Sequence, residues 1–288
     1  MEQDRISNLP GNIIDQILSL LPFKDAARTS ILSRNWRHKW AELPYLEFRD
    51  LSLSSGFKQK NEELARIVDH VLLLHIGPIL KFKLFFLDLR DLNSFDRWIF
   101  HLSRFPINEL EFITFVENYS MPSCLFTFRS LTSLVLSFCA LRPPSTFKGF
   151  PNLKNLDISN VNITQYAFEN LISSCPVLER LSVSFSNHIS HVTINVPHLR
   201  SLHVLANLES ISFENTYCLA EVFLIREEFT ANVIRACRSS TNLLKFFLQL
   251  PLLRTLQVDS FFLKVTAHTN HFWYKLLAFL VLFVERSL

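Results

Sequence analysis

Two pairs of histidines in this 288-residue chain have a spacing that metal ions can use. His188 with His191, and His268 with His271, would each offer two imidazole nitrogens on one helical turn. A zinc site in a protein needs three or four ligands. Neither pair has a cysteine or a carboxylate at a suitable spacing, so we expect no metal site.

The residues for nucleotide or hydrolytic chemistry do not form a recognisable pattern either. The chain has only four glycines, Gly11, Gly56, Gly77 and Gly149, and each is isolated. Neither a phosphate-binding P-loop nor a dinucleotide GxGxxG sequence can therefore be written. No GxSxG turn marks a nucleophilic serine. The sequence predicts no catalytic residue and no cofactor.

Composition and charge restrict the classes of partner. Formal net charge is +3, and 49% of the residues are hydrophobic, 28 of them Phe. So many apolar residues exclude a mainly disordered chain. Proteins that bind nucleic acids or membrane surfaces usually concentrate Lys and Arg heavily. We therefore expect a folded protein whose charge alone predicts neither kind of partner.

The cysteines indicate the compartment. They are odd in number, widely spaced and without a CxxC sequence: Cys124, Cys139, Cys175, Cys218 and Cys237. This spacing favours neither a disulfide framework nor a zinc module. We interpret them as small buried hydrophobic residues in a reducing compartment, which predicts a protein of the cytoplasm, the nucleus or both.

No segment is predicted to direct the chain into a membrane. The first apolar run, residues 13–21, is interrupted by Asp15 and Gln16, so it does not resemble a signal peptide. Residues 272–284 are apolar apart from Lys275, but a spanning helix needs about 20 such residues. A terminal packing helix or a sticky, poorly ordered end is favoured there, with a tail anchor as the alternative.

The first fifty residues predict three short helices. Apolar residues between Ile13 and Leu21 follow the rhythm of one broad helix face, and Pro22 ends that helix. A second helix is predicted over residues 24–31, and a third from Ser33, which would place Trp36 and Trp40 one turn apart. A module of this size buries little surface, so it should dock on a partner or cap the following domain.

The sequence of this module, from Ile6 to Trp40, resembles the plant F-box. The shared features are Leu-Pro, an Ile/Leu helix, a second Leu-Pro, Asp-Ala, Thr-Ser-x-Leu-Ser and Trp-Arg-x-x-Trp. The resemblance implies docking on a Skp-type adaptor and, through it, a cullin. The residues that it assigns to the adaptor interface or its support are Leu9, Pro10, Ile14, Ile17, Leu18, Leu21, Pro22, Leu32, Ser33 and Trp36.

The basic third helix permits a different interpretation. Arg34, Arg37, His38 and Lys39 would suit the recognition helix of a helix-turn-helix DNA-binding protein. No second basic stretch follows, and a solvated charged face explains the same residues. We therefore predict no nucleic-acid partner.

The rest of the chain contains an irregular repeat. The text Leu-x-x-Leu-x-Leu, or a hydrophobic equivalent, begins at Ile107, Leu131, Leu153, Leu178, Leu199, Leu219 and Leu253. Its central leucines from Leu110 to Leu202 are separated by 20 to 25 positions, which is the period of leucine-rich repeats. Each repeat predicts a short strand, and residues 166–174 predict a helix that ends before Cys175-Pro176.

This body resembles the leucine-rich repeats of plant F-box proteins, and the whole resemblance covers about residues 5–260. It departs from the family in two ways. Cys139 or Val161 stands where a turn Asn would form a hydrogen-bonded ladder, which predicts irregular curvature. The carboxy-terminal FBD region of the family is not recognisable.

The predicted fold is α/β: a small three-helix F-box, then an irregular leucine-rich-repeat solenoid with a parallel sheet on its concave face. The expected segments are an F-box (1–50), a linker with the first solenoid units (51–105), leucine-rich repeats (106–265) and a divergent apolar tail (266–288). Strand residues between the core positions would line the concave face. Candidates there for binding a target protein are Asn155, Asp157, Arg180, Ser182, His203, Glu221, Phe223 and Gln257.

These resemblances imply a substrate-recognition subunit of an SCF-type cullin-RING ubiquitin ligase. Such a subunit makes no bonds itself, because it acts by raising the concentration of a bound target near a conjugating enzyme. Two alternatives stay open. One is a non-catalytic interaction scaffold, and the other is a truncated, nonfunctional member of the family.

Overall fold

The structure is a computed structural model that forms two compact units, Met1–Phe138 and Cys139–Leu288. It describes residues 6, 9–49, 57–86, 92–115, 119–185, 189, 191–206, 208, 210–225 and 250–258. Cys237, His188, His268, His271 and the predicted apolar tail lie outside the described residues. The interpretations attached to them therefore stay predictions.

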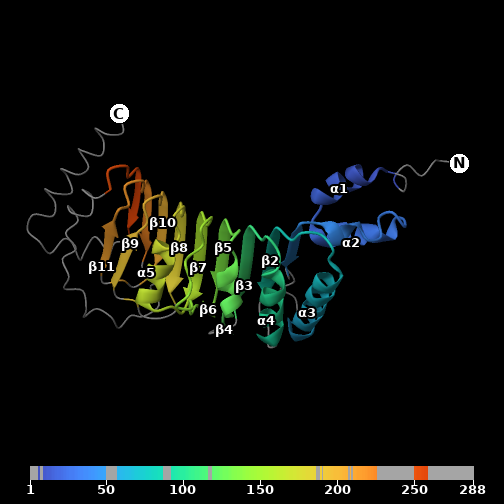
Figure 1. Cartoon of the computed structure of the whole chain (residues 1–288), viewed down its shortest axis with the longest axis horizontal. Coiled ribbons are helices and arrows are strands. Elements are labelled where there is room, and N and C mark those ends of the chain that lie inside the picture. Colours follow the sequence, from blue (N-terminus) through green and yellow to red (C-terminus); the bar gives the residue numbers. More distant parts are fainter. Residues whose placement is uncertain are drawn as a thin grey trace, which may run out of the picture. The chain divides into compact units, whose positions relative to one another are not determined.

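The first unit begins with a small helical module (Figure 1). Its elements are α1 (Gly11–Ser19), α2 (Phe23–Arg28) and two 3-10 helices, η1 (Thr29–Ile31) and η2 (Lys39–Glu42). A proline directly precedes each α-helix. The missing N–H of proline costs nothing there, because the first N–H groups of a helix have no partner within it.

The third helix predicted from Ser33 is wrong. Residues 34–38 form turns, and only η2 follows them. The Ser33 hydroxyl is buried without a hydrogen-bond partner among the described residues, so it caps no helix. Trp36 stabilises this turn region instead: its ring is buried, and its Nε1 donates to the Ile6 carbonyl oxygen at 3.1 Å.

A parallel sheet follows in the same unit. The strand order is β1-β2-β3-β5, and each neighbouring pair is parallel. The elements are β1 (Tyr45–Arg49), α3 (Phe57–Leu74), β2 (Lys81–Phe86), α4 (Leu92–Leu102), β3 (Glu109–Thr114), β4 (Tyr119–Ser120), η3 (Ser123–Thr127) and β5 (Ser133–Ser137). The strands predicted from the repeats at Ile107 and Leu131 are confirmed. The sheet starts earlier than expected, at Tyr45, inside the segment predicted as the F-box.

The second unit repeats the pattern with strand order β7-β8-β10-β12-β13. Its elements are β6 (Cys139–Ala140), β7 (Asn155–Val161), α5 (Gln165–Ser173), β8 (Arg180–Phe185), β9 (His191–Asn195), β10 (Ser201–Leu205), β11 (Ser210–Glu214), β12 (Glu221–Ile225) and β13 (Thr255–Val258). The predicted strands are confirmed here, as is the helix after Ile163. Strands β9 and β11 form a separate parallel pair.

The many phenylalanines build an aromatic row inside the first unit. Phe48, Phe82 and Phe112 lie on successive strands, with ring centroids 5.7 and 5.6 Å apart. Phe95 of α4 extends the row at one end, and Phe23 of α2 meets Phe48 at 5.3 Å at the other. Burying one such side chain contributes about 1.5–3 kcal/mol. The aromatic row therefore joins the helical module to the strands through a single core.

Within each unit, backbone hydrogen bonds join successive repeats. The Pro44 carbonyl oxygen accepts from the N–H groups of Leu80 and Lys81, at 2.9 and 3.0 Å. The Leu80 carbonyl then accepts from Asn108 and Glu109 in the same way. Five further carbonyl groups accept from two successive N–H groups in the same way, and we call the whole series the carbonyl spine. They belong to Asn108, Lys154, Glu179, Arg200 and Ala220.

At the turns, the positions where an Asn ladder would form are occupied by other residues. Cys139 and Val161, which stand at those positions, are buried, at 1% and 0% exposure. They add to the core, and backbone groups at this turn also join the repeats: the Cys139 carbonyl oxygen accepts from the Asn162 N–H at 2.8 Å. The irregular curvature predicted from these two residues stays a prediction.

Candidate functional site

The structure divides the predicted adaptor residues into core and surface. Ile14, Leu18 and Trp36 are at most 2% exposed, so they support the helical module from inside. Leu21 and Leu32 are 36% and 48% exposed. The remaining predicted positions are half-buried or exposed: Leu9, Ile17 and Ser33 are half-buried, and Pro10 and Pro22 are exposed.

The most exposed apolar residues of the module were missed by the sequence analysis. Leu20 is 85% exposed and Ile31 is 88% exposed. With Leu21 and Leu32 they form what we call the exposed apolar set. A signal was available, because apolar residues near the end of α1 are too numerous to fit one buried face. These four side chains are an apolar surface of the module that is open to a partner.

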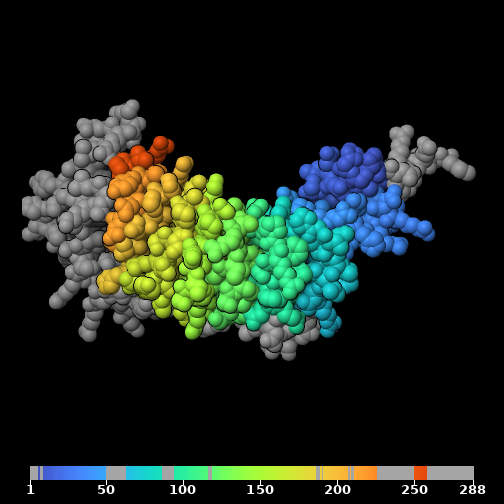
Figure 2. Space-filling view, in the orientation of Figure 1, coloured from blue at the N-terminus to red at the C-terminus, as the bar shows by residue number. Residues whose placement is uncertain are grey.

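The helical module is held against the start of the sheet (Figure 2). The Ala41 carbonyl oxygen of η2 accepts from the N–H groups of Ile76 and Gly77, at 3.0 and 3.3 Å. Gly77 allows this approach, because a Cβ at that position would lie 2.6 Å from the Glu42 carbonyl oxygen. The loop before β2 therefore packs directly against η2, at the end of the module.

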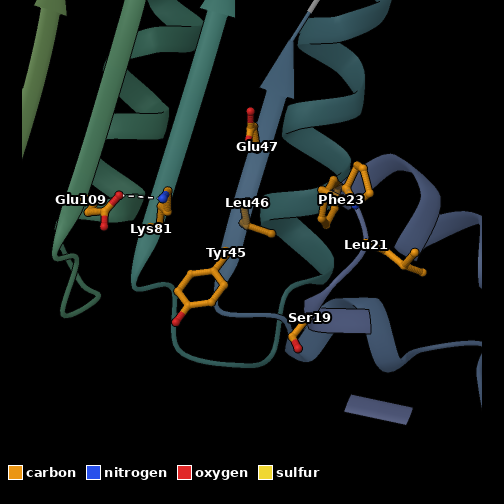
Figure 3. A pocket seen from close by; sticks show the side chains of 9 residues that line it. Ser19, Leu21, Phe23, Tyr45, Leu46, Glu47, Lys81 and Glu109 are labelled. Atoms are coloured by element: carbon orange, nitrogen blue, oxygen red, sulfur yellow. Dashed lines mark ion pairs between the residues drawn. The ribbon is translucent and has the colours of Figure 1, made fainter. Parts of the chain in front are cut away.

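A pocket of about 370 Å³ opens between the module and the first strands (Figure 3). Its lining residues are Ser19, Leu21, Pro22, Phe23, Tyr45, Leu46, Glu47, Lys81 and Glu109. Two of its charges neutralise each other, since Lys81 Nζ lies 2.7 Å from Glu109 Oε2. Aliphatic and aromatic side chains form its other wall. The pocket thus combines apolar side chains with the paired charges of Lys81 and Glu109 and with the carboxylate of Glu47, which pairs with Arg49.

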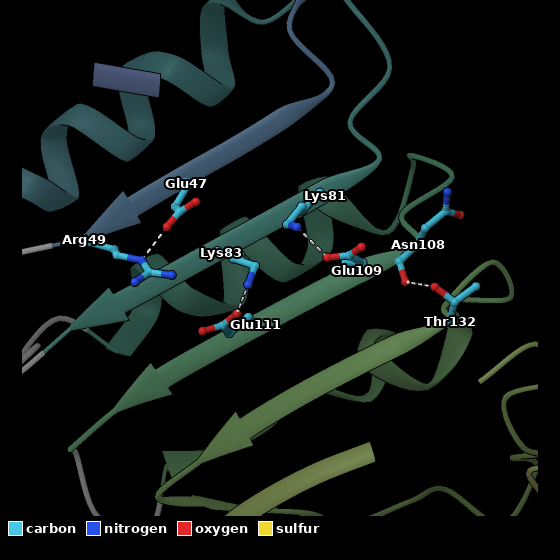
Figure 4. A network of polar contacts seen from close by, with 8 residues as sticks. All are labelled: Glu47, Arg49, Lys81, Lys83, Asn108, Glu109, Glu111 and Thr132. Atoms are coloured by element: carbon cyan, nitrogen blue, oxygen red, sulfur yellow. Dashed lines mark hydrogen bonds and ion pairs between the residues drawn. The ribbon is translucent and has the colours of Figure 1, made fainter. Parts of the chain in front are cut away.

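Paired charges continue across the open face of the first unit, by which we mean the face that carries the non-core strand residues (Figure 4). Lys83 Nζ lies 2.5 Å from Glu111 Oε2, and Arg49 pairs with Glu47. Each of these pairs is partly exposed, so each contributes little to stability. Their effect is to satisfy the charges of this face within the chain.

The open face of the second unit brings the predicted target-binding residues together in two rows. Strand register aligns the first row as Asn155, Arg180, Ser201, Glu221 and Thr255, and the second as Asp157, Ser182, His203, Phe223 and Gln257. The inward residues between them, such as Leu181 and Leu202, are buried. The predicted alternation of core and open positions is thus confirmed, while the binding role of each residue stays a prediction.

His203 and Phe223 form the one stacked ring pair among the described residues. Their centroids are 4.1 Å apart, with an angle of 28° between the ring planes. His203 is exposed and Phe223 half-buried. A flat aromatic surface that is open on one side suits contact with an apolar or aromatic side chain of a partner.

Of the described cysteines, Cys139 and Cys175 are buried as predicted, whereas Cys124 and Cys218 are half-buried. Burial raises the pKa of Cys139 to about 12 and that of Cys175 to about 11, so both stay protonated at neutral pH. Across the described ranges, no three His, Cys, Asp or Glu side chains gather in a way that could hold a metal ion. No helix in the described part of the chain is long and apolar enough to cross a bilayer.

A docking module joined to stacked parallel strands defines a protein–protein interaction architecture. Residues 6–48 match the family model of the F-box domain. Residues 95–241 match the family model of the leucine-rich repeats of the FBD-associated F-box protein At5g56370. The chain belongs to the plant F-box/leucine-rich-repeat family.

Similar proteins from Arabidopsis thaliana support this assignment. The chain is 37% identical to the F-box/FBD/LRR-repeat protein At1g13570 over 91% of its own length and 63% of the relative's. It is 30% identical to the putative F-box/LRR-repeat protein At3g58880, covering 78% and 54% of the two lengths. It is 33% identical to the F-box/LRR-repeat protein At3g58900, covering 73% and 70%. The chain therefore spans less than two thirds of the first two relatives.

Proposed function

We propose that this chain is the substrate-recognition subunit of an SCF-type cullin-RING ubiquitin ligase. Its F-box docks on a Skp-type adaptor, which joins it to a cullin, and its repeats bind a target protein for ubiquitylation. The chain itself is non-catalytic. Its contribution to ubiquitin transfer is the proximity of the bound target to a conjugating enzyme.

The exposed apolar set carries this proposal. Leu20 and Ile31 leave most of their surface in water although they flank the well-packed helices of an F-box. Covering each by a partner would contribute about 1.5 kcal/mol or more. Because they are so exposed, the same side chains contribute little to the stability of the chain alone. A role in docking explains why they are apolar.

The test is co-purification of the full chain with a recombinant Skp-type adaptor, comparing wild type with a Leu20→Ser/Ile31→Ser variant. Losing about 3 kcal/mol of apolar contact would weaken binding about a hundredfold. A Leu73→Ser/Tyr166→Ser variant is the matched control. Both of its positions are 80% exposed and lie outside the module. Circular dichroism checks that each variant folds.

Each outcome bears on the proposal. Binding that is lost in the F-box variant and kept in the control supports docking through the exposed apolar set. A folded wild type that fails to bind any adaptor rejects the ligase function and leaves an interaction scaffold. We further propose that the complex works in the cytoplasm, the nucleus or both, which imaging of a fluorescently tagged full chain tests.

A further inference from the structure

The open faces of the two units differ in how their charges are satisfied. In the first unit the charged residues Lys81 and Lys83 of β2 are each paired with a glutamate of β3. In the second unit Arg180 is exposed at the start of β8 and belongs to no ion pair among the described residues. Glu221 is likewise exposed, two strands away. The charges of Arg180 and Glu221 therefore remain available to pair with charges of a partner.

The edge where the strands of the second unit begin is cationic. Its charged residues are the exposed cations Lys154, Arg180, Arg200 and Arg254 and the anions Glu179 and Glu221. Only Lys154 and Glu179 form an ion pair in the described residues, at 3.9 Å. Three arginines thus remain against one free glutamate. Arginine binds carboxylates through paired hydrogen bonds, so an acidic group is the complement of this edge.

The opposite end of the same strands is apolar. Leu205 at the end of β10 and Ile225 at the end of β12 are neighbours in register, and each is 40% exposed. The stacked His203 and Phe223 lie two residues before them on the same strands. Along the direction of the strands, the cationic edge is thus followed by the aromatic pair of the open face and then by its aliphatic end.

Strand geometry fixes the distance between the two ends. Ser201 is the register partner of Arg180, and Leu205 follows Ser201 by four residues on β10. At about 3.3 Å per residue, the two ends lie about 13 Å apart. A second extended chain covers the same distance in four residues.

We propose that the open face of the second unit, at strands β8, β10 and β12, recognises a partner segment that carries a carboxylate four residues from a large apolar side chain. The carboxylate pairs with Arg180 and the neighbouring arginines. The apolar side chain packs on Phe223, Leu205 and Ile225. This rests on the proposed function, since the segment belongs to the target, and it assigns recognition to the second unit.

The test is selection of a displayed library of random twelve-residue peptides on the purified full chain. The same library is selected on Arg180→Gln and Phe223→Ser variants. Matched controls are Lys81→Gln, at the first position of β2, and Val135→Ser, at the central position of β5 in the first unit. The best enriched peptide is then synthesised, together with forms that lack the acidic or the apolar residue, for fluorescence anisotropy.

We expect enrichment of an Asp or Glu four positions from a Leu, Ile, Met or Phe, in either order. The synthetic peptide should lose at least fivefold in affinity with either second-unit variant and less than twofold with either control. No enrichment, a different pattern, or equal loss in the controls overturns the inference. Adaptor binding by the same preparations is measured in parallel, so a chain that binds its adaptor but selects no such peptide refutes only this inference.

Discussion

Replacing Gly77 by alanine tests how the F-box is seated on the repeats. The new Cβ would lie 2.6 Å from the Glu42 carbonyl oxygen and 3.0 Å from the carbonyl carbon and Cα of the same residue. All three are backbone atoms of η2, so a side-chain movement cannot relieve the clash. The loop or the end of the module must move, and the two hydrogen bonds from Ile76 and Gly77 to Ala41 weaken with it.

The expected cost follows from these contacts. Two backbone hydrogen bonds contribute about 1 kcal/mol each, and forcing a methyl group into a packed contact costs about 1–3 kcal/mol. We therefore expect Gly77→Ala to lower the free energy of unfolding of the first unit by about 3 kcal/mol. Gly11→Ala is the control, because its Cβ would meet only Lys39 Nζ, at 3.9 Å. That change should be neutral or slightly stabilising.

The assay is urea unfolding followed by tryptophan fluorescence in a Trp273→Phe background. The remaining tryptophans, Trp36, Trp40 and Trp98, then all belong to the first unit. A Gly77→Ala protein as stable as its parent to within about 0.5 kcal/mol, which is the size of an ordinary surface substitution, would refute the close contact between the loop and η2.

Three further predictions concern the rest of the chain. Gly149 has φ of 90°, and a Cβ there would lie 1.7 Å from a backbone oxygen, so Gly149→Ala should destabilise the second unit by more than about 3 kcal/mol in urea unfolding; an unchanged midpoint would contradict this. Burial lowers the pKa of His75 and His101. The unfolded chain then binds protons more readily below pH of about 6.5, so the free energy of unfolding should fall from pH 7.5 to 5.5, less steeply in a His75→Gln variant; equal slopes would refute the assignment. Cys139 and Cys175 should resist iodoacetamide in the native protein, and peptide mapping that finds them alkylated as fast as in urea would overturn it.

The repeats could be predicted from the sequence because their signal is local. Leu134 and Leu136, or Leu181 and Val183, repeat at strand spacing, and the strands form where that text occurs. Strand β1 was missed, and β2 lies in the segment predicted to hold the first solenoid units, although no strand was assigned there; both carry the same spacing. Phenylalanine replaces leucine at Phe48 in β1, and Ile79 and Phe82 begin the equivalent text at β2.

The F-box was recognisable by its residues, but the division between its core and its surface was not. Ile14 and Ile17 are three residues apart on one helix and share a side-chain type, yet the first is 1% exposed and the second half-buried. Burial depends on which other elements pack against α1, and helix periodicity carries no such information. The third helix failed for a related reason, since the burial of Trp36 and its hydrogen bond to the Ile6 carbonyl oxygen are contacts with the start of the chain that local periodicity does not show.

The carbonyl spine has a consequence for how a protein of this design can change its partners. The residues whose carbonyl groups form it are chemically unrelated: Pro44, Leu80, Asn108, Lys154, Glu179, Arg200 and Ala220. Main-chain N–H groups supply these bonds, with the Thr132 hydroxyl as an added donor to the Asn108 carbonyl oxygen, so stacking depends little on the side chain at the carbonyl position. Unlike Lys81 and Lys83, which pair with glutamates of the next strand, the open-face residues Arg180 and Glu221 form no ion pair between repeats among the described residues. Substitutions there can accumulate at little cost in stability, which lets the molecule acquire a new binding preference without being restacked.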